Sequence, residues 1–229
     1  MFGGAISLEM PERFVDVSSV RPLNDSQVNT FHFPIAFCRL THLLKEQECW
    51  VDADTDQSIV VEILGYNEDI SDSNSAQFYW EDNAQCNDAE GQHNAVHITS
   101  RDISAEVGVC ADPPATSTNG VVPTCWLISG VQQVAKFKEQ ARNTLAVHIA
   151  VLRLPHVETD IVIHYNQPLE LSADSSSASV ARAASNNEQA GAALGRGSAL
   201  TQEALVSLRI HDWGLFSAPS ESEEDESNG

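Results

Sequence analysis

Basic residues are scarce in this chain of 229 residues. It has 12 Lys and Arg against 33 Asp and Glu, which gives a formal net charge of -21 and a pI near 4.5. Nucleic acids and anionic lipid surfaces would repel such a protein, so the composition argues against both as direct partners. The acidic segment at the C-terminal end supplies only five of these negative charges, so most of the excess lies on the folded part.

Long apolar runs and cysteine pairs are also missing. No apolar run approaches the roughly 20 residues that a membrane-spanning helix needs, and residues 1–5 lack the basic region of a secretory signal. We therefore expect a protein of the nucleus and cytoplasm. The five cysteines are widely spaced and contain no CxxC pair, which predicts free thiols rather than a disulfide framework.

Motifs for catalysis or for metal binding are absent or incomplete. The chain has no GxSxG motif, and neither of its glycine pairs has the spacing of a phosphate-binding loop. Residues 52–56 resemble the start of a calcium loop, but Gln57 stands where glycine is required and Ile63 where the closing glutamate belongs. His93 and His97 have the spacing of helical metal ligands, but their segment has the composition of a loop. We expect no catalytic residue, no metal and no cofactor.

The apolar content of 42% predicts one globular domain over residues 1–216, followed by a disordered acidic tail over residues 217–229. Alternating and β-branched residues indicate a first strand over residues 3–10, a short connection or strand over 14–20, a hairpin and then a meander. The hairpin is expected over 48–52 and 58–64, and the meander over 124–135, 145–154 and 159–166. A helix is expected over 71–81, with its aromatic residues on the sheet. A helix over 132–147 is the alternative to the middle of the meander.

Two segments differ in composition from their neighbours. Residues 28–47 are apolar, with mostly basic charges, and interrupt the acidic surroundings. The codons of Val28 and Gln47 fit the two ends of an intron, so we hypothesise a translated, retained intron; the alternative is a genuine insertion with an amphipathic helix over 37–44. Residues 171–200 are rich in Ser, Ala, Gly and Asn, which predicts a mobile loop. We expect residues 204–216 to form a last strand that returns to the sheet.

Four carboxylates flank the short apolar segments in the first third of the chain, and only Arg21 offsets their charge locally. They are Asp16, Asp25, Glu48 and Glu62. If these segments lie side by side in one sheet, the carboxylates form an anionic surface suited to a basic partner. This surface is the candidate binding site of the chain.

Several short motifs, in order along the chain, together resemble one known family. They are FGGAI from Phe2, FVDVS from Phe14, RPLNDSQ from Arg21, ECWV from Glu48, QSIVVE from Gln57, ISGVQQVAK from Ile128, RLP from Arg153, TDIVI from Thr159 and DWGLF from Asp212. This set resembles the Ran guanine nucleotide release factor family, the Mog-type Ran-binding proteins. The resemblance covers nearly all of residues 1–168 and the closing segment, apart from residues 28–47 and the predicted mobile loop.

The resemblance implies an α+β fold, an αβα sandwich on a mainly antiparallel sheet similar to the photosystem PsbP domain. It also implies a monomer that binds the small GTPase Ran, promotes release of its guanine nucleotide and supports nuclear protein import. Carried over by motif, the acidic patch that engages Ran falls on Asp16, Asp25, Glu48 and Glu62. Gly65 and Val131 replace an acid and a lysine of the family pattern, and these departures bear on affinity.

A carboxylate pressed against a GTPase phosphate site would compete with phosphate for lysine and for the metal ion, and so weaken nucleotide binding. Two other classes of function are open at this stage. The first is an acidic adaptor or chaperone-like interaction domain without exchange activity. The second, ranked last, is an enzyme or lipid-binding sandwich, which would need a concave apolar pocket.

Overall fold

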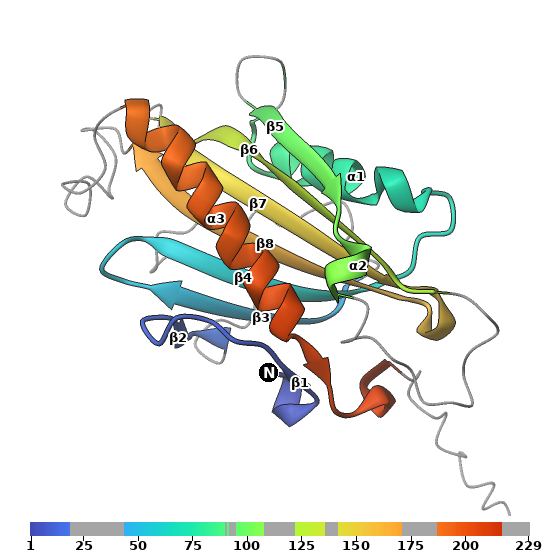
Figure 1. Ribbon diagram of the computed structural model, residues 1–229. Helices are drawn as coiled ribbons and strands as arrows, with labels where there is room; N and C mark the ends of the chain where they lie inside the picture. Colours follow the sequence, from blue (N-terminus) through green and yellow to red (C-terminus); the bar gives the residue numbers. More distant parts are fainter. Residues whose placement is uncertain are drawn as a thin grey trace, which may run out of the picture.

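The computed structural model describes residues 1–18, 44–89, 91, 95–107, 122–135, 142–170 and 187–216 (Figure 1). Short 3₁₀ helices carry the label η. In chain order the elements are η1 (Phe2–Gly4), β1 (Ile6–Ser7), β2 (Val15–Asp16), β3 (Leu44–Asp52), β4 (Gln57–Gly65), α1 (Asp72–Cys86), β5 (Ala95–Asp102), α2 (Ser104–Val107), β6 (Thr124–Ala135), β7 (Arg142–Leu154), η4 (Pro155–Val157), β8 (Thr159–Glu170), α3 (Asn187–Ser207), β9 (Arg209–Ile210) and η6 (Trp213–Phe216). None of the helices in these ranges is long and apolar enough to cross a membrane.

Seven strands form the main sheet, in the order β2-β3-β4-β8-β7-β6-β5, and every neighbouring pair is antiparallel. The predicted hairpin is confirmed as β3–β4, and the predicted meander as β6–β7–β8. The helix considered over residues 132–147 is wrong, because its described residues belong to β6 and β7. Strand β5, at the edge of the sheet, was not predicted.

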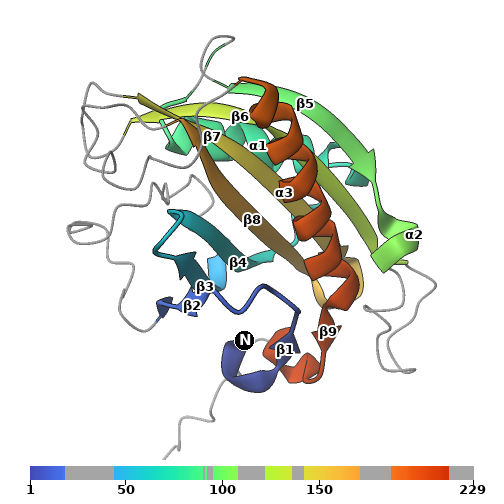
Figure 2. The same cartoon turned by 60° about the vertical axis from the view of Figure 1, so that its left-hand side comes forward.

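Helices cover both faces of this sheet. Helix α1 packs on one face and α3 crosses the other, as the two views in Figures 1 and 2 show. Along β4, Ile59, Val61 and Ile63 belong to the core on the α3 side, whereas Leu64 belongs to the core on the α1 side. The α+β class and the antiparallel sheet are therefore confirmed, while the likeness to the PsbP domain stays a prediction.

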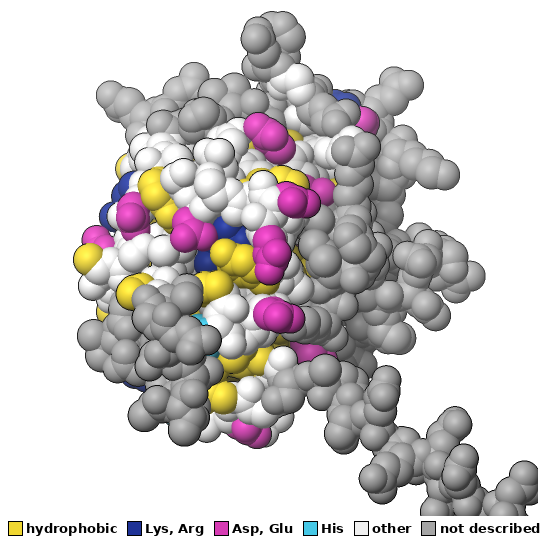
Figure 3. All heavy atoms as spheres, turned by 90° about the vertical axis from the view of Figure 1, so that its right-hand side faces the viewer, with side chains coloured by type: hydrophobic (Ala, Val, Ile, Leu, Met, Phe, Trp, Pro, Cys, Tyr) yellow, Lys and Arg dark blue, Asp and Glu magenta, His cyan; other side chains and the backbone are white. Residues whose placement is uncertain are grey.

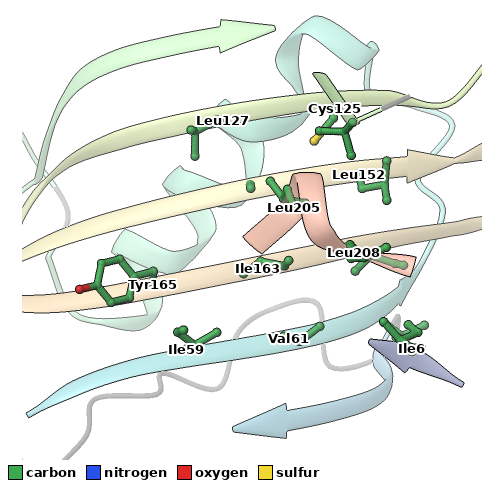
Figure 4. Packing of buried hydrophobic residues seen from close by; sticks show 14 of the residues in the cluster. Ile6, Ile59, Val61, Cys125, Leu127, Leu152, Ile163, Tyr165, Leu205 and Leu208 are labelled. Carbon is green, nitrogen blue, oxygen red and sulfur yellow. The ribbon is translucent and has the colours of Figure 1, made fainter. Parts of the chain in front are cut away.

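Helix α3 corrects the prediction of a mobile loop over residues 171–200, because residues 187–200 are helical. Its last turns place Leu205 over the sheet, and Leu208 follows directly after the helix (Figure 4). Each fully buried leucine contributes roughly 2 kcal/mol. Docking therefore stabilises a helix whose glycine-rich sequence has a weak preference for helix on its own. Residues 171–186 lie outside the described part of the chain.

The closing segment also differs from the prediction. Residues 204–207 complete α3, and β9 pairs with β1 in a separate two-stranded sheet instead of joining the main one. In η6, Trp213 lies against His156 of η4, with ring centroids 5.3 Å apart. The segment thus covers the end of the core on the α3 side. The predicted tail, residues 217–229, lies outside the described residues.

Strand β3 begins at Leu44, so the last four residues of the predicted insertion belong to the sheet. Leu44 pairs with Leu64, and Gln47 with Glu62. Residues 28–43 lie outside the described ranges, and the intron hypothesis stays a hypothesis.

A buried ion pair joins the meander to the start of α1. The side chain of Arg153 is only 1% exposed and donates to Asp160, to Asp72 and to the backbone carbonyls of Asn67 and Ile70. The Tyr79 hydroxyl donates to the second oxygen of Asp160, at 2.9 Å. The Asp160 carboxylate, at the start of β8, is therefore part of the core. Burial raises the pKa of Asp160, and the Arg153 charge opposes that shift.

His148 lies buried between β7 and α3. Its Nδ1 is 2.8 Å from the Ser129 hydroxyl, and its ring stacks on Tyr165. Gly197 of α3 packs so closely that a Cβ at this position would lie 2.2 Å from Nε2 of His148. Only glycine permits this distance between helix and strand.

The burial of His148 should make the free energy of unfolding depend on pH. Desolvation lowers the pKa of its imidazole to about 4 in the folded state, so the unfolded state binds more protons at any pH between that value and the ordinary one near 6.5. Its contribution to stability is thus present at neutral pH and is lost as the pH falls, by about 2 kcal/mol between pH 7.5 and pH 5. Urea unfolding of the wild-type chain and of His148→Leu at both pH values tests this; equal pH slopes would contradict it.

Candidate partner-binding site

Asp16 and Glu48 lie on the α3 side of the sheet, near its β2 edge. Asp16 pairs with Trp50, which packs against the core on that side. Its carboxylate is exposed and accepts two hydrogen bonds from Ser18, from the backbone N–H at 2.8 Å and from the hydroxyl at 2.5 Å. Asp16 is available to a partner.

Glu48 has a structural role instead. One carboxylate oxygen accepts a hydrogen bond from the backbone N–H of Phe2, which fastens η1 to β3. The other oxygen is buried, and it has no hydrogen-bond partner within the part of the chain that the structure describes. A residue held in this way offers little charge to a partner.

Glu62 lies on the opposite face, the α1 side. On β4 it alternates with Val61 and Ile63, which belong to the core under α3. Its Oε1 accepts a hydrogen bond from Nε2 of Gln47 at 2.6 Å, and its Oε2 lies 3.0 Å from Nε2 of His164 on β8. The side chains of Glu62 and His164 remain 21% and 11% exposed.

The structure therefore does not gather the predicted carboxylates on one surface. The register of the β3–β4 hairpin pairs Glu48 with Val61, which sends Glu48 and Glu62 to opposite faces. Asp25 lies outside the described residues. The single anionic surface expected from the sequence is corrected to two separate groups, and the roles of Asp16, Asp25, Glu48 and Glu62 in partner binding stay predictions.

One further acidic residue belongs with Glu62. Asp82 on α1 is half-buried, and it has no hydrogen bond or ion pair among the described residues. Desolvation raises the pKa of its carboxyl, and the charge of His164 opposes that shift, so Asp82 and His164 interact electrostatically. Burial and the Asp160 carboxylate raise the pKa of Tyr79, one turn earlier on the same helix, and the charge of Glu62 adds a smaller contribution in the same direction. We name the three residues Glu62, His164 and Asp82 the α1-side acidic group.

The helical spacing of Tyr79 and Asp82 in the sequence could have placed both on the sheet-facing side of α1. No local pattern of residues indicates the register that brings His164 beside Glu62. Acidic side chains are spread over another face too, the one in Figure 3, where Lys and Arg are few. Negative charge alone therefore does not single out one binding surface.

Of the sites considered for metals, the calcium-like segment begins with a residue in another role, whereas His93 lies outside the described residues. Asp52 is buried and forms an ion pair with Arg13 at 2.9 Å, so it is not a solvated turn ligand. Within the described ranges no group of three or more His, Cys, Asp or Glu residues could hold a metal ion. The absence of a disulfide framework, expected from the sequence, stays a prediction.

These features define a class: an α+β protein with an antiparallel sheet between helices and with carboxylates on both of its faces. Comparisons with known proteins agree. The model of the family described as "Ran-interacting Mog1 protein" matches residues 41–168. The chain belongs to this Ran-interacting Mog1 family, whose named members are GTPase regulators rather than enzymes.

Curated relatives carry the name Ran guanine nucleotide release factor. The Ran guanine nucleotide release factor of Danio rerio is 32% identical over 216 residues, which cover 94% of this chain and 97% of that protein. The factor of the same name from Homo sapiens is 31% identical over 169 residues, or 73% of this chain and 74% of that protein. The crystal structure of the Saccharomyces cerevisiae Ran-binding protein Mog1p is 20% identical, covers 95% of this chain and 96% of that one, and has a TM-score of 0.54, which supports the fold.

Proposed function

We propose that this protein binds the small GTPase Ran and promotes release of its guanine nucleotide, in support of nuclear protein import. Membership of the Ran-interacting Mog1 family carries this proposal. The chain would act in the nucleus and the cytoplasm, as a monomer in contact with Ran. Its net charge of -21 suits a partner with a basic surface.

The α1-side acidic group supports Ran binding best among the described carboxylates. Glu48 is engaged by Phe2, whereas Glu62 stays partly exposed and Asp82 has no hydrogen bond within the described structure. A half-buried carboxylate without a hydrogen bond has already lost part of its hydration. A lysine or arginine of a partner would therefore gain more from Asp82 than from an exposed carboxylate such as Asp16, which already accepts hydrogen bonds from Ser18.

The same group suggests how nucleotide release could follow. Negative charge placed against the phosphate site of a GTPase competes for the lysine and the metal ion that hold the phosphates. The effect is electrostatic and needs no catalytic residue on this chain. It fits a site where Glu62 and Asp82 both interact with His164 on the α1 side of the sheet.

Charge reversal on α1 tests the proposal. Asp82→Lys is expected to weaken Ran binding at least about 10-fold, because it places a cation where the partner's cation should lie. The matched control is Glu81→Lys, which has the same charge change at the neighbouring exposed position and should alter binding by less than about 3-fold. Asp16→Lys reports on the opposite face in the same way.

Binding is measured by calorimetry, and release by the fluorescence of a labelled guanine nucleotide on Ran. Release should slow steeply as salt rises, since the attraction is between charges in partial contact with solvent. Equal losses in Asp82→Lys and Glu81→Lys would contradict the assignment of the site. Binding without any faster release would favour the acidic adaptor over the exchange factor.

A further inference from the structure

His164 is the one base that the described structure places within the α1-side acidic group. It projects from β8 on the same side as Val162, which belongs to the core under α1. Its strand neighbours Val60 and Ile149 are apolar. The charged groups that face it are Glu62 from β4, whose Oε2 lies 3.0 Å from Nε2, and Asp82 from α1.

The charge state of this imidazole changes what the group offers to a partner. A neutral imidazole can donate one hydrogen bond to Glu62 and leaves two negative charges in place. A protonated one forms a short ion pair with Glu62, reduces the net charge of the group from two negative to one and repels an approaching cation. Imidazole is the side chain whose charge ordinarily changes near physiological pH.

We propose that His164 makes the binding of a basic partner to the Glu62 and Asp82 carboxylates depend on pH, strong when its imidazole is neutral and weaker when it is protonated. This inference rests on the proposed function, because it concerns the same site. His164 is a regulatory residue here: it need not touch the partner, and it acts through Glu62.

Gln47 allows the pH-dependent role of His164 to be distinguished from a role in merely positioning Glu62. Its amide donates to the other oxygen of Glu62, at 2.6 Å, and cannot titrate. Loss of Gln47 removes a positioning contact but leaves the proton-dependent one. The two neighbours of Glu62 therefore predict different behaviour: His164 should control the pH profile, and Gln47 should not.

The test measures the affinity of Ran for the full chain at pH 7.5 and pH 5.5. The proteins are the wild-type chain, His164→Gln, which can still donate a hydrogen bond to Glu62, and Gln47→Ala. Wild type and Gln47→Ala should lose roughly 3- to 10-fold in affinity as the pH falls, whereas His164→Gln should lose less over the same interval, whatever its affinity at pH 7.5. Titration of Ran itself is common to all three and cancels in their ratios.

Thermal melts at both pH values establish that each variant is folded. Ran binding with the same pH ratio for wild type and His164→Gln would overturn the inference and leave the proposed function in place. Absence of Ran binding by the wild-type chain at both pH values would overturn the proposed function, and this inference with it.

Discussion

Replacing Arg153 with methionine is expected to lower the free energy of unfolding by about 3–5 kcal/mol, because it leaves Asp160 buried without its cation. The carbonyls of Asn67 and Ile70 lose their donor in the same step. Chemical denaturation measures the change, and a fall in Tm of roughly 10 °C should accompany it.

The control for Arg153 is Arg142→Met. Arg142 pairs with Asp88, whose side chain is 91% exposed, and such a pair contributes about 1 kcal/mol or less. In the double variant Arg153→Met with Asp160→Asn, part of the lost stability should return, since the uncompensated charge is gone. A loss in Arg153→Met no larger than that in Arg142→Met would show that the buried network is not needed to hold α1 on the sheet.

Gly197→Ala is expected to destabilise the protein by about 3 kcal/mol. The added Cβ would lie 2.2 Å from Nε2 of His148, a side chain that the core holds on both sides, so α3 must move away from the sheet. Equilibrium unfolding in urea gives the magnitude, and near-UV circular dichroism reports on the packing of Tyr165 against His148.

Gly195→Ala is the matched control, two residues earlier on the same helix. Nothing lies within 4 Å of a Cβ at that position. The substitution should therefore stabilise the chain by up to about 1 kcal/mol through the higher helix propensity of alanine. Opposite signs for the two glycines are the expected result, and equal signs would contradict the close packing of α3 on His148.

The strands of the hairpin and the meander could be predicted because β-branched residues and turn residues carry their signal locally. Helix α3 could not, since few of its residues are large and apolar, and docking on the sheet, rather than propensity, stabilises it. Strand β5 was missed for a related reason: its sequence, AVHITSRD, has few apolar residues.

The candidate site shows the same limit. Composition and the family motifs led to Asp16, Glu48 and Glu62, but a hairpin register that differs by one residue moves a side chain to the other face. The pairing of Asp52 with Gln57 at the turn determines the register of the hairpin, and this register places Glu48 and Glu62 on opposite faces of the sheet. The pairing of β4 with β8, about 100 positions away in the chain, then brings His164 to Glu62.

The small sheet of β1 and β9 has a consequence for the order of folding. Ile6 pairs with Ile210, and the Ser7 hydroxyl forms a hydrogen bond with Nε2 of His211, 204 positions further on. During synthesis on the ribosome, β1 can pair with β9 only after almost the whole chain has been made. Contacts so distant in sequence slow folding, so the N-terminal segment should be among the last parts of the molecule to become protected from hydrogen exchange.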